Sequence, residues 1–183
     1  MGSEINAAAA ALEEKLCGEY CCMENLGEND SWIVPFIPSS IRDIDDCLRI
    51  LGVSYSCSLI DIGCGDGRVV CRAAASYGCR AAGFDLSNEC VALAKKRAEN
   101  EGVSHLVDFS VADFAQAAFW ERDDVCGANC VFLYIDERAL GVCKAGIEGL
   151  IRRGAKVTTL VYHFDGIGKA SSFRDGKIVL YHR

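Results

Sequence analysis

The chain has 183 residues, 51% of them hydrophobic, which is enough for one domain with a real core and too little for a second full domain. Its formal net charge of -7 is concentrated in residues 1–31, which carry seven acidic side chains and one basic side chain. The nearly neutral remainder has no stripe of Lys and Arg, which disfavours binding of nucleic acid through its phosphates.

The N-terminal part of the chain predicts a helix and a linker. An alanine run favours a helix over residues 4–22, and the polar residues 24–31 indicate a linker. We therefore expect an acidic N-terminal segment over 1–31 and one domain over 32–183. The acidic, Ala-rich start is unlike an Arg-rich transit peptide, and no apolar run approaches the roughly 20 residues that span a bilayer. A cytoplasmic protein without stable membrane insertion is expected.

Residues 32–40 carry two prolines within four positions, which excludes a central strand or a helix interior. The segment should be extended, with Trp32 and Phe36 either closing over a ligand or pinning the linker. Ser39 or Ser40 is then placed to cap a helix that runs through Leu51.

From residue 58 onward, strand and helix patterns alternate. Strands are expected at 58–62, 80–85, 107–111, 129–135 and 156–163, helices at 68–77, 88–101 and 137–153, and a short helix or turn at 114–120. This alternation predicts an α/β fold: a doubly wound, mostly parallel sheet of six or seven strands with helices on both faces.

The end of the chain breaks the alternation. Only about a dozen residues separate the strand that ends near residue 163 from the apolar run 177–182, too few for a crossover helix. The last strand is therefore expected to be antiparallel. An Asp175-Gly176 turn should lead into it from a short strand near 171–173.

Twelve cysteines raise the question of a disulfide scaffold. Most of them fall on the expected helices, strands and glycine loop, where a small hydrophobic side chain fits. The Cys17-x3-Cys21 and Cys126-x3-Cys130 spacings differ from the Cys-x2-Cys pairs of structural zinc sites. We expect reduced, mostly buried thiols and no metal.

Residues 59–70 set an apolar strand directly against Gly63, Gly65 and Gly67 and then a helix. Glycine allows a sharp turn and the close approach of a ligand, and a helix N-terminus favours a carboxylate or ribose nearby. A dinucleotide site would need Gly-x-Gly-x-x-Gly/Ala, but Arg68 and Val70 occupy the third position in the two registers. Asp85 ends the next strand, where a carboxylate can accept hydrogen bonds from both ribose hydroxyls.

The glycine spacing, with Asp61 before it and Asp85 after the next strand, resembles motif I of the class I S-adenosylmethionine-dependent methyltransferases. The resemblance implies that Asp113 accepts the adenine amino group beside Phe114, that Leu86 packs on the adenine, and that Asp61 orients the loop and the methionine amine. A purely structural role for Asp61 is the alternative. The cofactor-binding positions expected for S-adenosylmethionine are Pro38, Ser39, Asp61, Gly63, Cys64, Gly65, Gly67, Asp85, Leu86, Asp113 and Phe114.

A narrower resemblance rests on the segments 35–40, 61–68 and 132–135. They are similar to a small family that includes the lysine methyltransferases of the mitochondrial ADP/ATP carrier and of the c-type ring protein of ATP synthase. This implies N-methylation of a protein lysine or another amine. The membrane-targeting segment of the mitochondrial members is missing and the sequence after the fourth strand differs, so the acceptor stays open, as does the oligomeric state.

Tyr134, Asp136 and His163 follow the two strands beside the glycine loop, where a doubly wound sheet places its substrate, and we predict that they are catalytic. A lysine has a reference pKa near 10.4, so the site must favour its neutral form. His163 could instead be a structural hydrogen bonder and Tyr134 a core residue. The alternatives in function are a small-molecule methyltransferase, an inactive cofactor-binding partner protein and a dinucleotide-dependent oxidoreductase.

Overall fold

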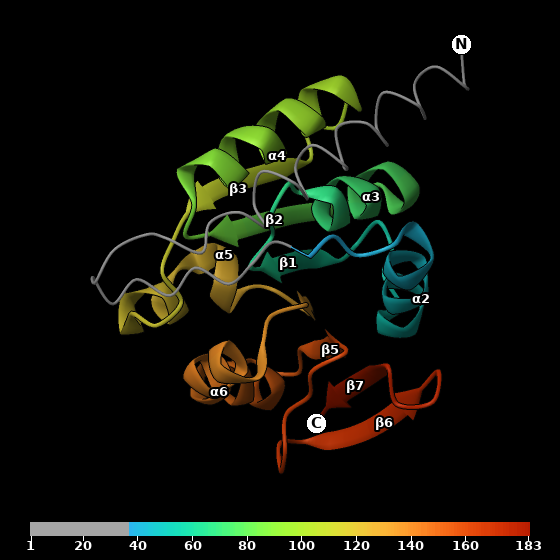
Figure 1. Ribbon diagram of the computed structural model, residues 1–183, viewed down its shortest axis with the longest axis vertical. Coiled ribbons are helices and arrows are strands. Elements are labelled where there is room, and N and C mark those ends of the chain that lie inside the picture. The colour runs from blue at the N-terminus through green and yellow to red at the C-terminus, as the bar shows by residue number, and fades with distance from the viewer. Residues whose placement is uncertain (1–36) are drawn as a thin grey trace. The chain divides into compact units, whose positions relative to one another are not determined.

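The computed structural model describes residues 37–183 (Figure 1). The chain divides into two compact units, residues 1–39 and 40–183, and the second unit contains every helix and strand reported below. The expected N-terminal helix, the linker and the roles of Trp32 and Phe36 lie outside the described residues. The predicted boundary between residues 31 and 32 does so as well.

The described strands form one seven-stranded sheet in the order β3-β2-β1-β4-β5-β7-β6. The first five strands along the chain run parallel, and β7 is antiparallel to both β5 and β6. The strands are β1 (Ser58–Ile62), β2 (Arg80–Asp85), β3 (Val107–Val111), β4 (Cys130–Leu133), β5 (Lys156–Leu160), β6 (Lys169–Phe173) and β7 (Ile178–His182). This confirms the predicted doubly wound α/β sheet with an antiparallel C-terminal strand.

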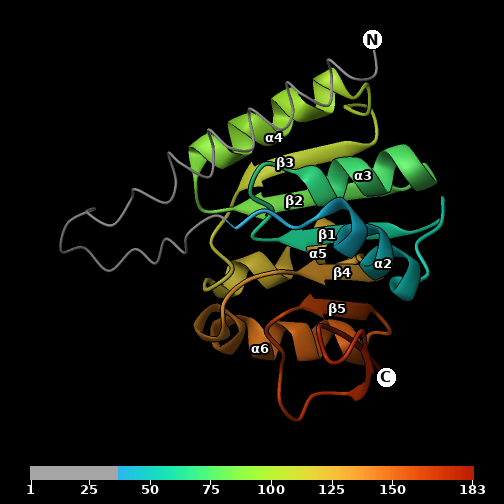
Figure 2. The same ribbon diagram turned by 45° about the vertical axis from the view of Figure 1, so that its right-hand side comes forward.

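Helices cover both faces of the sheet, as Figures 1 and 2 show. One apolar core lies beneath α2 (Ile41–Leu51), α3 (Arg68–Tyr77) and α4 (Asn88–Asn100). The other lies beneath a 3-10 helix (Ala117–Glu121), α5 (Asp123–Cys126) and α6 (Glu137–Arg152). The short helix expected at 114–120 therefore starts later, and α5 was not predicted.

The start of α2 follows the predicted capping chemistry. The Ser40 hydroxyl accepts a hydrogen bond from the Asp43 backbone N–H at 3.1 Å, and Gly52 ends the helix with a φ of 72°. The Asp43 carboxylate is buried and binds Lys177 at 2.8 Å and Arg174, both next to the β6–β7 turn. Burial alone would raise the pKa of Asp43, but the hydrogen bonds from Lys177, Ser40 and Arg174 lower it. These contacts join α2 to the C-terminal hairpin.

Two predicted strands are shorter in the structure. The strand expected at 129–135 is limited to Cys130–Leu133. The strand expected at 156–163 ends at Leu160, because Val161 has a φ of 71° and turns the chain out of the sheet. The expected hairpin is confirmed, and Arg174, Asp175 and Gly176 all have positive φ, the conformation that a tight turn needs.

Among the helices of residues 37–183, none combines the length and the apolar character needed to cross a bilayer. The nine cysteines in this part of the chain are free, most of them buried. In the same residues no three potential metal ligands come together.

Gly146 on α6 provides a test of the packing against the 3-10 helix. A Cβ at this position would clash with the Trp120 indole. Gly146→Ala should therefore lower the free energy of unfolding by about 1–3 kcal/mol, measured by urea denaturation. Gly141→Ala on the same helix is the matched control, since no described residue lies within 4 Å of its added methyl. It should stabilise by up to about 1 kcal/mol; equal effects of the two changes would contradict the packing argument.

Candidate functional site at the glycine loop

The loop between β1 and α3 depends on glycine for its backbone and its packing. Gly63, Gly65 and Gly67 have φ values of 80°, 52° and 76°, a region that other residues rarely adopt. A Cβ on Gly63 would lie 2.6 Å from the Ile135 side chain, and one on Gly67 would lie 2.7 Å from Ala94. At these two positions the missing side chain makes room for the protein itself. The sequence argument about ligand approach does not explain them.

Backbone and carboxylate groups of β2 hold the loop. The N–H groups of Gly63 and Cys64 both donate to the Phe84 carbonyl, at 2.8 and 3.0 Å. The Gly65 N–H donates to Asp85 Oδ2 at 2.8 Å, and Asp85 Oδ1 accepts from the Ser87 N–H at 3.0 Å. Asp85 thus connects the loop to the start of α4. Each carboxylate oxygen can accept a further bond, so its predicted role toward a ribose stays a prediction.

Two arginines hold the buried carboxylate of Asp66 inside the loop. Arg68 binds it through two nitrogens at 2.9 and 2.8 Å, and Arg97 of α4 binds Oδ2 at 2.6 Å. Arg97 also donates to the Asp66 backbone carbonyl at 3.1 Å. Burial alone would raise the pKa of Asp66, but the two guanidinium groups outweigh it and lower the pKa. The ion cluster fixes the loop to a helix that follows it by one strand.

Asp61 carries the unsatisfied carboxylate of the site. Its side chain is 2% exposed at the loop end of β1, and its Oδ1 has no hydrogen-bond partner among residues 37–183. Burial, followed by the nearby carboxylates of Asp85 and Asp66, raises the pKa of Asp61 well above the ordinary aspartate value. Cys64 is also buried here, and burial followed by Asp61 raises the pKa of its thiol. A cation that reaches Asp61 Oδ1 would find an oxygen without a competing partner in this part of the chain.

Apolar and polar groups follow at the ends of β2 and β3. Leu86 and Val111 are large apolar side chains left 41% and 44% exposed, near Asp85 and Asp113 respectively. The Asp113 carboxylate accepts from the Ala115 N–H at 2.8 Å and from Gln116 at 3.1 Å. The Phe114 carbonyl accepts from the Trp120 indole at 2.9 Å. The topology thus brings Leu86, Asp113 and Phe114 to the edge that holds the glycine loop.

The three predicted catalytic residues differ in their surroundings. Asp136 caps α6, since its Oδ1 accepts from the Ala139 N–H at 2.7 Å. His163 shares one hydrogen bond with the Thr159 hydroxyl at 2.7 Å and another with the Gly176 carbonyl at 2.5 Å, so both ring nitrogens are occupied. Tyr134 is half-buried after β4 and packs against the core under α2. Catalytic roles for Asp136 and His163 would therefore compete with bonds that hold the fold.

Pro38 and Ser39 belong to the first compact unit, which is described apart from the second, so their predicted cofactor contacts stay predictions. Arg97, Ile135 and Val161 were missed by the sequence reasoning. Arg97 is one basic residue among several on α4, and nothing in its spacing indicates a bond to residue 66. Val161 continues an apolar run, which conceals the end of the strand.

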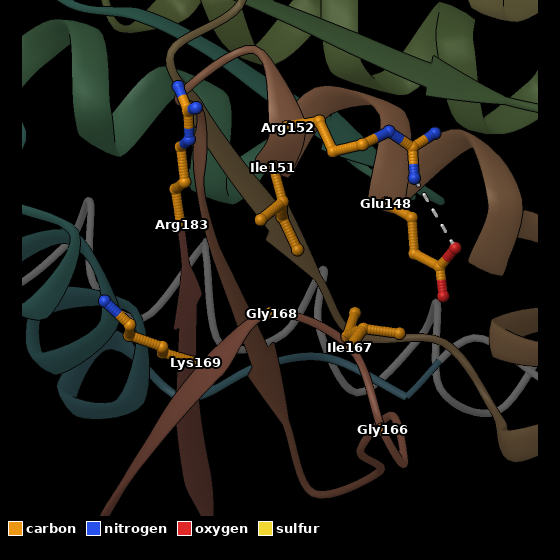
Figure 3. A pocket seen from close by; sticks show the side chains of 8 residues that line it. All are labelled: Glu148, Ile151, Arg152, Gly166, Ile167, Gly168, Lys169 and Arg183. Carbon is orange, nitrogen blue, oxygen red and sulfur yellow. Dashed lines mark ion pairs between the residues drawn. The ribbon is translucent and has the colours of Figure 1, made fainter.

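The most prominent hollow lies elsewhere, between the C-terminal half of α6, the β5–β6 connection and Arg183 (Figure 3). Its volume is about 670 Å³, and Ile151 and Ile167 lie between Lys169 and Arg152 in this view. Arg152 faces Glu148 at 3.8 Å. Of the described residues that line this hollow, none belongs to the glycine loop, so its size does not make it the functional site.

Comparison with known proteins agrees with this geometry. The model of the ANTKMT methyltransferase domain family matches residues 61–170. A human lysine N-methyltransferase named for the c-type ring protein of ATP synthase is 35% identical over 92 residues, covering 50% of this chain and 39% of the human protein. A protein-lysine N-methyltransferase of Saccharolobus islandicus is 25% identical over 134 residues, covering 73% of this chain and 80% of that protein. The match thus spans well under half of the human relative.

Solved structures show the same fold. An RNA methyltransferase from Salinibacter ruber in complex with S-adenosyl-L-homocysteine superposes with a TM-score of 0.69 at 24% identity. The superposition covers 79% of this chain and 92% of that one. At this identity the likeness supports the fold alone.

Arg97→Gln tests whether the ion cluster holds the loop. The change removes the Arg97 bonds to Asp66, and because bonds to charged groups contribute about 1.5–3 kcal/mol, the free energy of unfolding should fall by about that amount. Arg152→Gln, which loses an exposed pair at 3.8 Å, should change stability by less than about 0.5 kcal/mol.

The pH dependence gives a second measure of the same variant. The pKa of Asp66 is lowered, so its ionised form contributes stability at neutral pH that is lost as the pH falls through the folded-state value. The difference between wild type and Arg97→Gln should therefore shrink in acid. A difference that is constant with pH would show that Arg97 acts through packing alone.

Proposed function

The chain belongs to the ANTKMT methyltransferase domain family, and from this premise we propose that it is an enzyme that transfers a methyl group from S-adenosylmethionine to an amine, the side chain of a protein lysine. The observation that carries the proposal is Asp61, a buried carboxylate at the end of β1 whose Oδ1 lacks a partner among residues 37–183. S-adenosylmethionine carries an ammonium group and a sulfonium, both cations. Relatives named as lysine N-methyltransferases support the choice of acceptor.

The residues of the loop fit such a cofactor in separate ways. Asp61 would bind the methionine ammonium, and Asp85 would accept the ribose hydroxyls while keeping the Gly65 N–H in place. Leu86 and Val111 offer exposed apolar surface for an adenine ring, with Asp113 beside them. When bound, the cofactor supplies an activated methyl group. The protein has to hold the acceptor amine in line with it and favour the amine's neutral form by desolvation.

The choice of a lysine acceptor goes with a largely structural set of polar groups. Asp136 and His163 are occupied by the α6 cap and by the link between β5 and the hairpin turn. We therefore assign the binding of the acceptor to Tyr134 and its neighbours and give Asp136 and His163 supporting roles. A small-molecule acceptor and an inactive partner protein are the alternatives to be tested. The cytoplasmic location expected from the sequence also stays a prediction.

Transfer of tritiated methyl groups into a fractionated lysate tests the function. We expect label in the protein fraction, released as methylated lysine after hydrolysis. Asp85→Ala should lower the affinity for S-adenosylhomocysteine by about 10–150-fold, since hydrogen bonds to a charged group contribute about 1.5–3 kcal/mol, each step of 1.4 kcal/mol being tenfold.

Asp124→Ala is the control for the Asp85 variant, because this partly exposed aspartate pairs with Arg122 on the far side of the 3-10 helix and should leave affinity unchanged. Label in small molecules would support the alternative acceptor. Cofactor binding without label in any fraction would support the inactive partner protein.

Proton release on binding tests the role of Asp61. Because its pKa is raised in the free protein, Asp61 carries a proton at pH values where an ordinary aspartate has lost it. A bound ammonium favours the ionised form, so binding of S-adenosylhomocysteine should release a proton, and affinity should rise with pH across that window. Titration calorimetry in buffers of different ionisation enthalpy measures the release. Asp61→Asn should abolish it; an unchanged release in this variant would assign the proton to another group.

A further inference from the structure

The chain makes a strained turn directly after β5. Val161 has a φ of 71°, and the Tyr162 N–H donates to the Leu160 carbonyl at 2.9 Å, which closes a three-residue γ-turn. A positive φ is a genuine outlier for a β-branched residue. Such strain persists only where the surrounding structure holds it, and it concentrates at functional sites.

Several bonds from outside the turn hold it. The Val161 N–H donates to the Lys177 carbonyl at 2.8 Å. The His163 ring spans the turn from the other side, with the Thr159 hydroxyl at 2.7 Å and the Gly176 carbonyl at 2.5 Å. The turn is therefore fixed to β5 and to both ends of the Gly176–Lys177 segment. Tyr162, which stands at its tip, is left 41% exposed.

The strand order places this turn beside the proposed cofactor loop. Ile62 pairs with Leu133, and Leu133 pairs with Thr159, so the chain leaves β1, β4 and β5 at one edge of the sheet. Tyr134 leaves β4 between the glycine loop and the Val161 turn. Burial first, and then the nearby Tyr162 hydroxyl, raises the pKa of Tyr134, which keeps its phenol neutral. Two tyrosines from neighbouring strands thus lie near the position where an acceptor amine must reach the cofactor.

We propose that Tyr162, presented by the strained Val161 turn, forms with Tyr134 an aromatic binding surface for the cationic side chain of the acceptor. This inference rests on the proposed methyltransferase function and deepens it. An ammonium over the face of a tyrosine is attracted by the ring quadrupole, more strongly when water is excluded. The aromatic surface binds the ammonium before transfer and a methylated ammonium after it. His163 is then a positioning residue that holds the turn through Thr159 and Gly176, and it takes no proton from the substrate.

Choline provides a probe that does not depend on turnover. Its carbon isostere, 3,3-dimethylbutan-1-ol, has the same shape without the charge. Binding of both is measured by NMR titration of the full chain saturated with S-adenosylhomocysteine. Choline should bind at least about fivefold more tightly than the isostere. Tyr162→Ala should weaken choline binding about 3- to 10-fold, as expected for loss of one cation–π contact, and Tyr162→Phe should retain it.

Tyr55→Ala is the matched control, because this tyrosine is 82% exposed before the opposite end of β1 and should not affect choline. Equal binding of choline and the isostere, or unchanged binding in Tyr162→Ala, would overturn the proposal. S-adenosylhomocysteine affinity, measured separately, reports on the cofactor loop. A chain that binds choline in this pattern but transfers no methyl group would contradict the proposed function and leave the cation site standing.

The positioning role of His163 has its own readout. His163→Ala should weaken choline binding and speed hydrogen exchange at the Tyr162 amide, while affinity for S-adenosylhomocysteine stays unchanged. His163→Gln, which can still donate and accept, should restore both properties in large part. If His163→Ala lowers thermal stability but leaves choline affinity as in wild type, the histidine is structural only and the assigned role is wrong.

Discussion

The structure of the site depends on the bonds that hold a loop of three glycines in one conformation. Glycine loses more backbone freedom on folding than any other residue, so a loop built from it needs restraint from outside. The restraint comes from separate elements: β2 through Asp85, α3 through Arg68 and α4 through Arg97. The buried Asp66 carboxylate is the centre of this arrangement. It links two helices that are separated in sequence by β2, and its charge is balanced inside the protein.

Much of the fold follows from local patterns. The bounds of β1, β2, β3 and α3 agree with those expected from apolar runs and glycine positions, because turn residues lie close to the ends of these elements. The patterns fail where tertiary contacts decide. Residues 134–135 and 161–163 extend the expected strands, yet β4 stops at Leu133 and β5 at Leu160. In the second case a β-branched residue adopts a positive φ, and bonds from the β6–β7 turn hold it there.

The site was predictable in position but not in its internal bonds. The order of strands and glycines predicts the sheet edge where Asp61, Asp85 and Asp113 lie, since parallel strands present their carboxyl ends together. The partners of those residues could not be predicted, because they come from distant elements. Nothing local indicates that Arg97 binds Asp66 or that the His163 ring reaches the Gly176 carbonyl. A histidine after a strand suggests chemistry; with both nitrogens bonded, it acts as a link between β5 and the hairpin.

Asp61 and Thr158 are both left incompletely satisfied on the same face of the sheet. Asp61 pairs in register with Phe132, and Phe132 pairs with Thr158, so the two polar side chains flank one aromatic ring. Within residues 37–183, Asp61 Oδ1 and Thr158 Oγ1 have no hydrogen-bond partner, and each such group costs about 1–3 kcal/mol. A domain with a stability of about 5–15 kcal/mol loses a sizeable share to them.

The cost is concentrated beside the loop that is held most firmly. Asp66 shows that this protein can satisfy a buried carboxylate when it supplies two arginines. For Asp61 Oδ1, a few residues earlier, residues 37–183 supply no partner, and the neighbouring carboxylates raise the pKa further. The rigid loop and the unsatisfied carboxylate therefore belong together: the first fixes where a ligand sits, and the second reserves a place for the ligand's positive charge.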